Sequence, residues 1–172
     1  PKRRYFSLGI LIIVVAATGW ALVNQRDILD WLKLRDYVAP PAISSLADQT
    51  TMNDFSRRVF YVNQPQLEGK TDFSNFCPNN GGEQTIVLGC YHSNQRGIYL
   101  LNVTDLRLDG VEQVTAAHEM LHAAYDRLNS KDRKDVDKLL IDYYNDGLND
   151  ERIKTTIEAY RESEPNDVVN EM

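Results

Sequence analysis

The residue types best suited to chemistry are His118, Glu119 and His122, which form the pattern H-E-x-x-H. Zinc prefers tetrahedral nitrogen and oxygen ligands, and histidines four positions apart lie one helical turn apart, so both can bind one ion. Zinc would polarise a scissile carbonyl and acidify a bound water, and Glu119 would take the water's proton and pass it to the leaving amine. The pattern therefore predicts zinc-dependent hydrolysis, with Glu119 as the general base.

The two histidines need a helix, and the surrounding sequence predicts one. From Glu112 to Leu128 the apolar residues recur at spacings of three and four. These residues are Val114, Ala117, Leu121, Ala124 and Leu128. We expect this stripe to face the core, with both histidines beside it and Glu119 on its rim. The alternative is a partly buried helix with two structural histidines.

The residues around the motif are small or uncharged, namely Thr115-Ala116-Ala117 before it and Ala123-Ala124 after it. This resembles the extended pattern of zinc metallopeptidases, the zincins. From about Trp31 onward the chain also resembles uncharacterised bacterial proteins with one N-terminal membrane anchor and a predicted gluzincin-like domain. The resemblance is carried by Cys77, by Leu88-Gly89-Cys90-Tyr91 and by the segment 114–128.

The gluzincin resemblance implies a third zinc ligand, a Glu on a downstream helix that often follows Asn. Asn170-Glu171 resembles that pair, 49 residues after His122, and the domain would then continue beyond Met172. Glu158 and Glu164 are rival candidates. Asp126, one turn after His122, would accept a hydrogen bond from the second nitrogen of a ligand histidine, act as the third ligand, or pair with a nearby Arg.

Three short runs rich in β-branched or aromatic residues predict strands, at Arg58–Val62, Thr85–Gly89 and Gly97–Val103. The stretch between the last two is compatible with a hairpin. We expect a small antiparallel sheet packed on the H-E-x-x-H helix, followed by helices from Ser130 and over Glu151–Glu162. Zincin resemblance implies that Gly97–Val103 is the sheet edge that a substrate peptide would join.

The chain contains two cysteines, Cys77 and Cys90. In an oxidising compartment such a pair favours a disulfide, which would stabilise the domain by about 3 kcal/mol. Half of a metal site is the alternative, although metal-binding pairs are usually closer in sequence.

An uncharged run of 19 residues, Tyr5–Val23, follows the basic triplet Lys2, Arg3 and Arg4. As a helix it is about 28 Å long, close to the thickness of a bilayer's hydrocarbon core. The triplet predicts a cytoplasmic N-terminus and an extracytoplasmic body. A cleaved signal peptide is the alternative, since Ala16, Ala17 and Ala21 would provide a cleavage site.

The charge pattern bears on partners. The basic triplet accounts for three of the 19 basic side chains, which leaves 16 basic against 25 acidic ones after Val23, a formal charge of −9. So acidic a body argues against a nucleic-acid partner, because phosphate binding needs a basic face.

We divide the chain into three parts: a basic tip and membrane anchor at 1–23, an amphipathic helix and stalk at 24–54, and a zincin-like α+β domain at 55–172. The amphipathic helix is expected over Asn24–Val38, and Ile43–Asp54 is either a polar stalk or a further short helix. The leading expectation is a membrane-anchored zinc peptidase that hydrolyses peptides or proteins outside the cytoplasm. The alternatives are a non-catalytic binding or scaffold domain with a structural or vestigial zinc, and a zinc amidase for cell-wall peptides.

Overall fold

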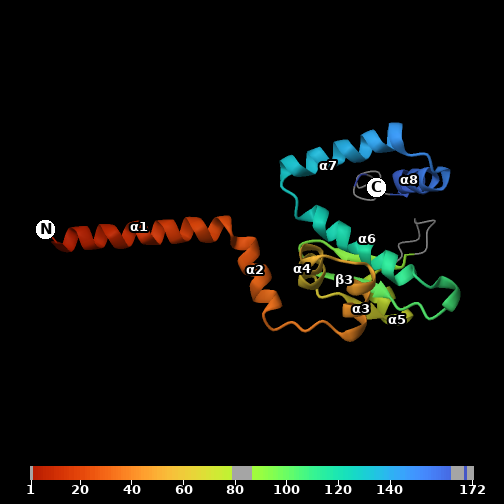
Figure 1. Ribbon diagram of the computed structural model, residues 1–172, viewed down its shortest axis with the longest axis horizontal. Helices are drawn as coiled ribbons and strands as arrows, with labels where there is room; N and C mark the ends of the chain where they lie inside the picture. The colour runs from red at the N-terminus through yellow and green to blue at the C-terminus, as the bar shows by residue number, and fades with distance from the viewer. Residues whose placement is uncertain (1, 79–86, 164–168, 170–172) are drawn as a thin grey trace. The chain divides into compact units, whose positions relative to one another are not determined.

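The computed structural model describes residues 2–78, 87–163 and 169, with residues 2–8 and 163 described by their backbone alone (Figure 1). The chain divides into two compact units, Pro1–Val38 and Ala39–Met172. The second unit carries the sheet and the H-E-x-x-H motif, and it begins earlier in the chain than residue 55. Its architecture is mostly helical α+β, with one three-stranded sheet in the described part.

The first unit consists of the two helices that the sequence predicted, α1 (Lys2–Val23) and α2 (Gln25–Leu34). Asn24 separates them, and its side-chain amide donates a 2.8 Å hydrogen bond to the carbonyl of Trp20. Within the described residues, no single helix is long and apolar enough to cross a membrane. The segments Gly9–Val23 and Gln25–Leu34 meet that requirement together by length and composition, with a 70° bend between them.

The second unit begins with α3 (Pro41–Gln49) and α4 (Asp54–Val62). The short-helix alternative for Ile43–Asp54 is therefore correct, since Ile43 and Leu46 of α3 lie in the core. The strand predicted over Arg58–Val62 is wrong, because these residues are the last turns of α4. The Asn53 side chain accepts a hydrogen bond from the backbone N–H of Ser56 and caps the helix. This cap and the burial of the helix in the core together outweigh the β propensity of residues 58–62.

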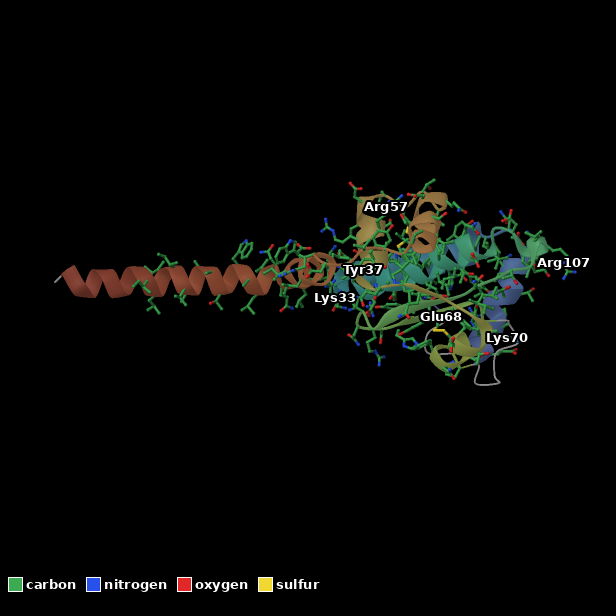
Figure 2. All side chains as sticks on the ribbon, turned by 90° about the horizontal axis from the view of Figure 1, so that it is seen from below. Lys33, Tyr37, Arg57, Glu68, Lys70 and Arg107 are labelled. Carbon is green, nitrogen blue, oxygen red and sulfur yellow. A yellow bond between two sulfur atoms is a disulfide. The ribbon has the colours of Figure 1, made fainter. Side chains whose placement is uncertain are left out.

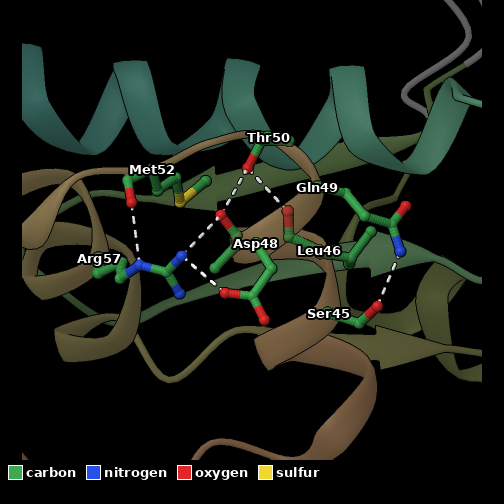
Figure 3. Close-up of polar contacts among 8 residues, drawn as sticks. Ser45, Leu46, Asp48, Gln49, Thr50, Met52 and Arg57 are labelled. Carbon is green, nitrogen blue, oxygen red and sulfur yellow. Dashed lines mark hydrogen bonds and ion pairs between the residues drawn. The ribbon is translucent and has the colours of Figure 1, made fainter.

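Arg57 joins α3 to α4 (Figure 3). Its Nε donates to the carbonyl of Met52 at 2.9 Å, and its Nη2 lies 2.7 Å from a carboxylate oxygen of Asp48. The Thr50 hydroxyl donates to the carbonyl of Leu46 at 2.7 Å and closes the end of α3. These contacts hold α3 and α4 together.

The sheet has the order β1-β3-β2, from β1 (Gln66–Glu68), β2 (Gly89–His92) and β3 (Gly97–Leu101). β2 and β3 form an antiparallel hairpin, as the sequence predicted, and its turn has positive φ at Asn94 and Gln95. The first strand lies later than predicted, because residues 90–92, which were expected in the turn, belong to β2. β1 runs parallel to β3, so the sheet is mixed and not antiparallel throughout. The predicted edge strand at Gly97–Val103 is also wrong, because β3 is paired on both sides. Of the predicted strand Thr85–Gly89, residues 85 and 86 lie outside the described residues.

Helix α5 (Lys70–Phe76) is attached to the hairpin at three points. The predicted disulfide joins Cys77 to Cys90 of β2, with 5.9 Å between their Cα atoms (Figure 2). The carbonyl of Phe76 lies 2.9 Å from Nε2 of His92, and the Phe76 ring stacks on Tyr99 at 4.2 Å. β2 is therefore held on its α5 side by covalent and polar contacts.

Helix α6 (Val111–Asp126), which the sequence predicted, packs on β2 and β3 and also contacts α3 and α4 (Figure 1). It follows a short 3-10 turn, η1 (Leu106–Leu108), and starts after Gly110, whose φ of 89° suits glycine. The core between these elements consists of apolar side chains from α3, α4, β3 and α6 and from the loop between α3 and α4. It comprises Ile43, Leu46, Ala47, Met52, Val59, Phe60, Ile98, Leu100, Ala116, Met120 and Ala123.

The predicted C-terminal helices are present as α7 (Ser130–Asp142) and α8 (Glu151–Ser163). A π-helical segment, η2 (Tyr143–Gly147), extends α7 and ends at Gly147. The hydroxyl of Tyr125 on α6 donates to Asp137 of α7 at 2.6 Å, which joins the C-terminal helices to α6.

Candidate metal centre

His118 and His122 face one another across one turn of α6. Their Nε2 atoms lie 2.8 Å apart, and the ring centroids are separated by 4.4 Å at an interplanar angle of 89°. Two nitrogens about 2.05 Å from one zinc in tetrahedral geometry would lie about 3.3 Å apart, so the pair fits an ion after a movement of about 0.5 Å. The two rings therefore lie on one face of the helix, as their spacing in the sequence predicted.

The surroundings of His118 favour its neutral imidazole form. Partial burial lowers the pKa of His118, and the neighbouring His122 lowers this pKa further. Only a deprotonated imidazole nitrogen has a lone pair to donate, so a neutral His118 is ready to bind a metal without first losing a proton.

The buried face of α6 differs from the predicted stripe. It is made of four side chains: Ala116, Glu119, Met120 and Ala123. Val114 and Leu121, expected in the core, are 71% and 61% exposed. Two alanines on the buried face let the helix lie close to its neighbours. The histidines flank the exposed apolar residues and are half-buried.

The side chain of Glu119 points from α6 toward β2, and the residue is only 5% exposed. The sequence predicted a position on the rim of the apolar stripe instead. Glu119 packs against the backbone of Gly89, the first residue of β2. A Cβ built on Gly89 would lie 2.7 Å from Oε1 of Glu119 and 2.5 Å from Cγ2 of Thr115. The carboxylate therefore occupies a narrow space beneath the histidine-bearing helix, on the β2 side.

Asp126 joins the end of α6 to its neighbours. Its Oδ2 accepts from the Tyr91 hydroxyl at 2.9 Å and from the backbone N–H of Asn94 at 3.2 Å. Its Oδ1 lies 3.7 Å from the guanidinium of Arg133, the ion pair that the sequence left open. Burial and the bond to Asp126 raise the pKa of Tyr91 to about 12, so this hydrogen bond persists at neutral pH.

A third ligand is not present among the described residues, where no group of three or more His, Cys, Asp or Glu side chains is placed to hold a metal ion. Glu171 and Glu164 lie outside those residues. Glu158 is described, and it accepts from the Tyr144 hydroxyl and pairs with Arg161 at 2.9 Å. The two histidines thus fit zinc as part of a ligand set.

No protein-family model, curated protein or solved structure matches this chain. Gly89 and Thr115 lie against Glu119, and neither was among the predicted site residues. A glycine within a predicted strand is a signal of close backbone approach, and Gly89, the last residue of the predicted strand Thr85–Gly89, carries that signal.

Proposed function

We propose that the chain is a membrane-anchored zinc-dependent peptidase that cleaves peptide bonds outside the cytoplasm. The observation that carries the proposal is the histidine pair, with Nε2 atoms 2.8 Å apart on one turn of α6. A half-buried pair at this separation is suited to sharing one divalent ion. The zincin-like assignment of the second unit is part of the same proposal, supported by the packing of α6 on the sheet.

In this proposal His118 and His122 hold the ion through their Nε2 atoms. Zinc, when bound, supplies a Lewis acid that polarises the scissile carbonyl and acidifies water. A carboxylate oxygen of Glu119 takes a proton from the attacking water and delivers it to the departing amine nitrogen. The low exposure of Glu119 keeps its carboxylate out of bulk solvent. In this less polar environment its charge interacts more strongly with a developing positive charge.

The membrane anchor is proposed from the N-terminal unit. Gly9–Val23 and Gln25–Leu34 together have sufficient length and apolar composition, and the basic triplet before them favours a cytoplasmic N-terminus. The Cys77–Cys90 disulfide supports a location outside the cytoplasm, because such bonds persist in oxidising compartments.

A non-catalytic anchored domain with a structural zinc is the second candidate. The observation that favours it is the burial of Glu119 against Gly89, since a base must reach a water molecule during hydrolysis. The two candidates differ in whether Glu119 contributes to bond cleavage once zinc is bound.

The test is peptide cleavage by the full chain in detergent micelles, saturated with zinc and incubated with a library of quenched fluorescent peptides. Glu119→Gln should retain the zinc stoichiometry of the wild type and lose about 10²- to 10⁴-fold in kcat. Glu112→Gln is the matched control on the same helix: Glu112 accepts from the backbone N–H of Val103, and an amide oxygen keeps that bond. Unchanged cleavage by Glu119→Gln would exclude the mechanism, and zinc binding without any cleavage by the wild type would favour the non-catalytic domain.

A further inference from the structure

We infer that Gly89 is a positioning residue for Glu119: the bare backbone at the start of β2 sets where the carboxylate lies relative to the histidine pair. This inference rests on the proposed function, in which Glu119 is the general base. It begins from the space around Gly89. A Cβ there would lie 2.5 Å from Thr115 Cγ2, 2.7 Å from Glu119 Oε1 and 2.9 Å from Glu119 Cγ. Each separation is well below the van der Waals contact of about 3.5–4.0 Å between carbon atoms.

The two side chains on α6 differ in their freedom to move. The hydroxyl of Thr115 donates to the carbonyl of Val111 at 2.9 Å, and a β-branched residue in a helix has few rotamers. Glu119 has three side-chain torsions, and its carboxylate is their far end. An added methyl at position 89 therefore displaces the Glu119 carboxylate more readily than it displaces Thr115.

The backbone of β2 cannot easily retreat instead, because contacts lie on both sides of Gly89. Before it, the carbonyl of Leu88 accepts from the N–H of Leu101 at 2.9 Å. After it, Cys90 is bridged to Cys77 at the end of α5. One residue further, the Tyr91 hydroxyl donates to Asp126 at the end of α6 and ties β2 to the helix that carries Glu119.

The histidines lie away from this contact. On a helix turning 100° per residue, Glu119 points about 100° from His118 and 60° from His122. A methyl at position 89 thus acts on the base and leaves the proposed ligands in place. Gly89→Ala should separate catalysis from metal binding.

The experiment compares zinc-loaded full-length wild type, Gly89→Ala and Gly69→Ala in the peptide assay. Gly69 precedes α5, and nothing lies within 4 Å of a Cβ there, so this substitution is a control for glycine replacement itself. We expect Gly89→Ala to retain zinc and KM while kcat falls about 10- to 100-fold, since a displacement of about 1 Å at a reacting group has this effect. Gly69→Ala should match the wild type. A Gly89→Ala variant with wild-type kcat overturns the inference.

Two further variants distinguish positioning from general destabilisation. Thr115→Ser removes Cγ2 and keeps the hydroxyl, so Gly89→Ala/Thr115→Ser should recover part of the lost kcat. Gly89→Ala/Glu119→Gln should be no slower than Glu119→Gln alone, because the displaced carboxylate is already absent. Additive losses would mean that Gly89 acts through another group, and the inference would be wrong.

A structural readout makes the test independent of turnover. Crystal structures of zinc-loaded wild type and Gly89→Ala should differ in the position of the Glu119 carboxylate by about 1 Å or more, with His118 and His122 superimposed. An unmoved carboxylate would refute the inference even if the wild type cleaved no peptide. Absence of cleavage by the wild type alone would count against the proposed function and leave this comparison to decide the role of Gly89.

Discussion

Zinc should stabilise the second unit against unfolding, and the effect should depend on His118 and His122. Binding requires the two Nε2 atoms to separate from 2.8 Å to about 3.3 Å, which breaks the hydrogen bond between the rings. That bond contributes about 0.5–1.5 kcal/mol, whereas structural zinc sites contribute roughly 10–16 kcal/mol of binding free energy. Even an incomplete ligand set therefore outweighs the cost of opening the pair.

The magnitude follows from linkage between binding and folding. Free zinc at 100 times its Kd adds about 2.7 kcal/mol to the free energy of unfolding, or about 10 °C in Tm for a unit of this size. Replacing one histidine by alanine removes a metal–nitrogen bond and should weaken binding at least about 100-fold. At the same zinc concentration the remaining stabilisation would be about 0.4 kcal/mol, and Tm would rise by less than about 2 °C.

The assay is thermal unfolding of the full chain at pH 7.5, followed by far-UV circular dichroism with and without zinc, for wild type, His118→Ala and His122→Ala. His92→Ala is the control, because His92 is the remaining histidine and contacts the carbonyl of Phe76. Its Tm without zinc should fall, while the rise on adding zinc should stay at the wild-type value. An equal rise in all three variants would place the metal elsewhere, and no rise in the wild type would refute the metal centre.

The other predictions concern stability. Met120→Ala should lower the free energy of unfolding, measured by urea titration, by about 2–4 kcal/mol, because Met120 is buried. Leu121→Ala should lower it by less than about 0.5 kcal/mol, because Leu121 is exposed. Equal losses would contradict the buried face described for α6. Reducing the Cys77–Cys90 bridge should cost about 3 kcal/mol, seen as a lower urea midpoint in dithiothreitol, whereas a midpoint indifferent to reductant would show that the bridge contributes nothing. The pKa of Tyr91 is raised to about 12 in the folded state, so the stability that its hydrogen bond contributes is complete below pH 10 and is lost as the pH rises to 12. Tyr91→Phe should lack that alkaline decline, about 1 kcal/mol after allowing for partial exposure, and a decline identical to that of the wild type would exclude this origin.

Local patterns predicted most of the helices and the disulfide. The spacing of His118 and His122 was enough to place their rings on one face, because helical geometry depends on sequence separation alone. The helices α7 and α8 were predicted from the same periodicity, whereas the strand before the hairpin turn was placed too early, since β2 is Gly89–His92. Arg58–Val62 was misassigned because strand propensity was considered without the Asn53 cap, a signal that is present in the sequence.

The sequence by itself determined that two imidazoles lie one turn apart beside a carboxylate, since three neighbouring positions on a helix have a defined angular relation. Only the tertiary structure decided that Glu119 faces β2, that Leu121 faces outward, and that β3 lies at the centre of the sheet. Helical periodicity defines a pattern on each face and does not choose which face is buried. The buried face of α6 is decided by how closely the helix packs against Gly89 and the core. This packing depends on the shapes of elements that are not neighbours in the sequence.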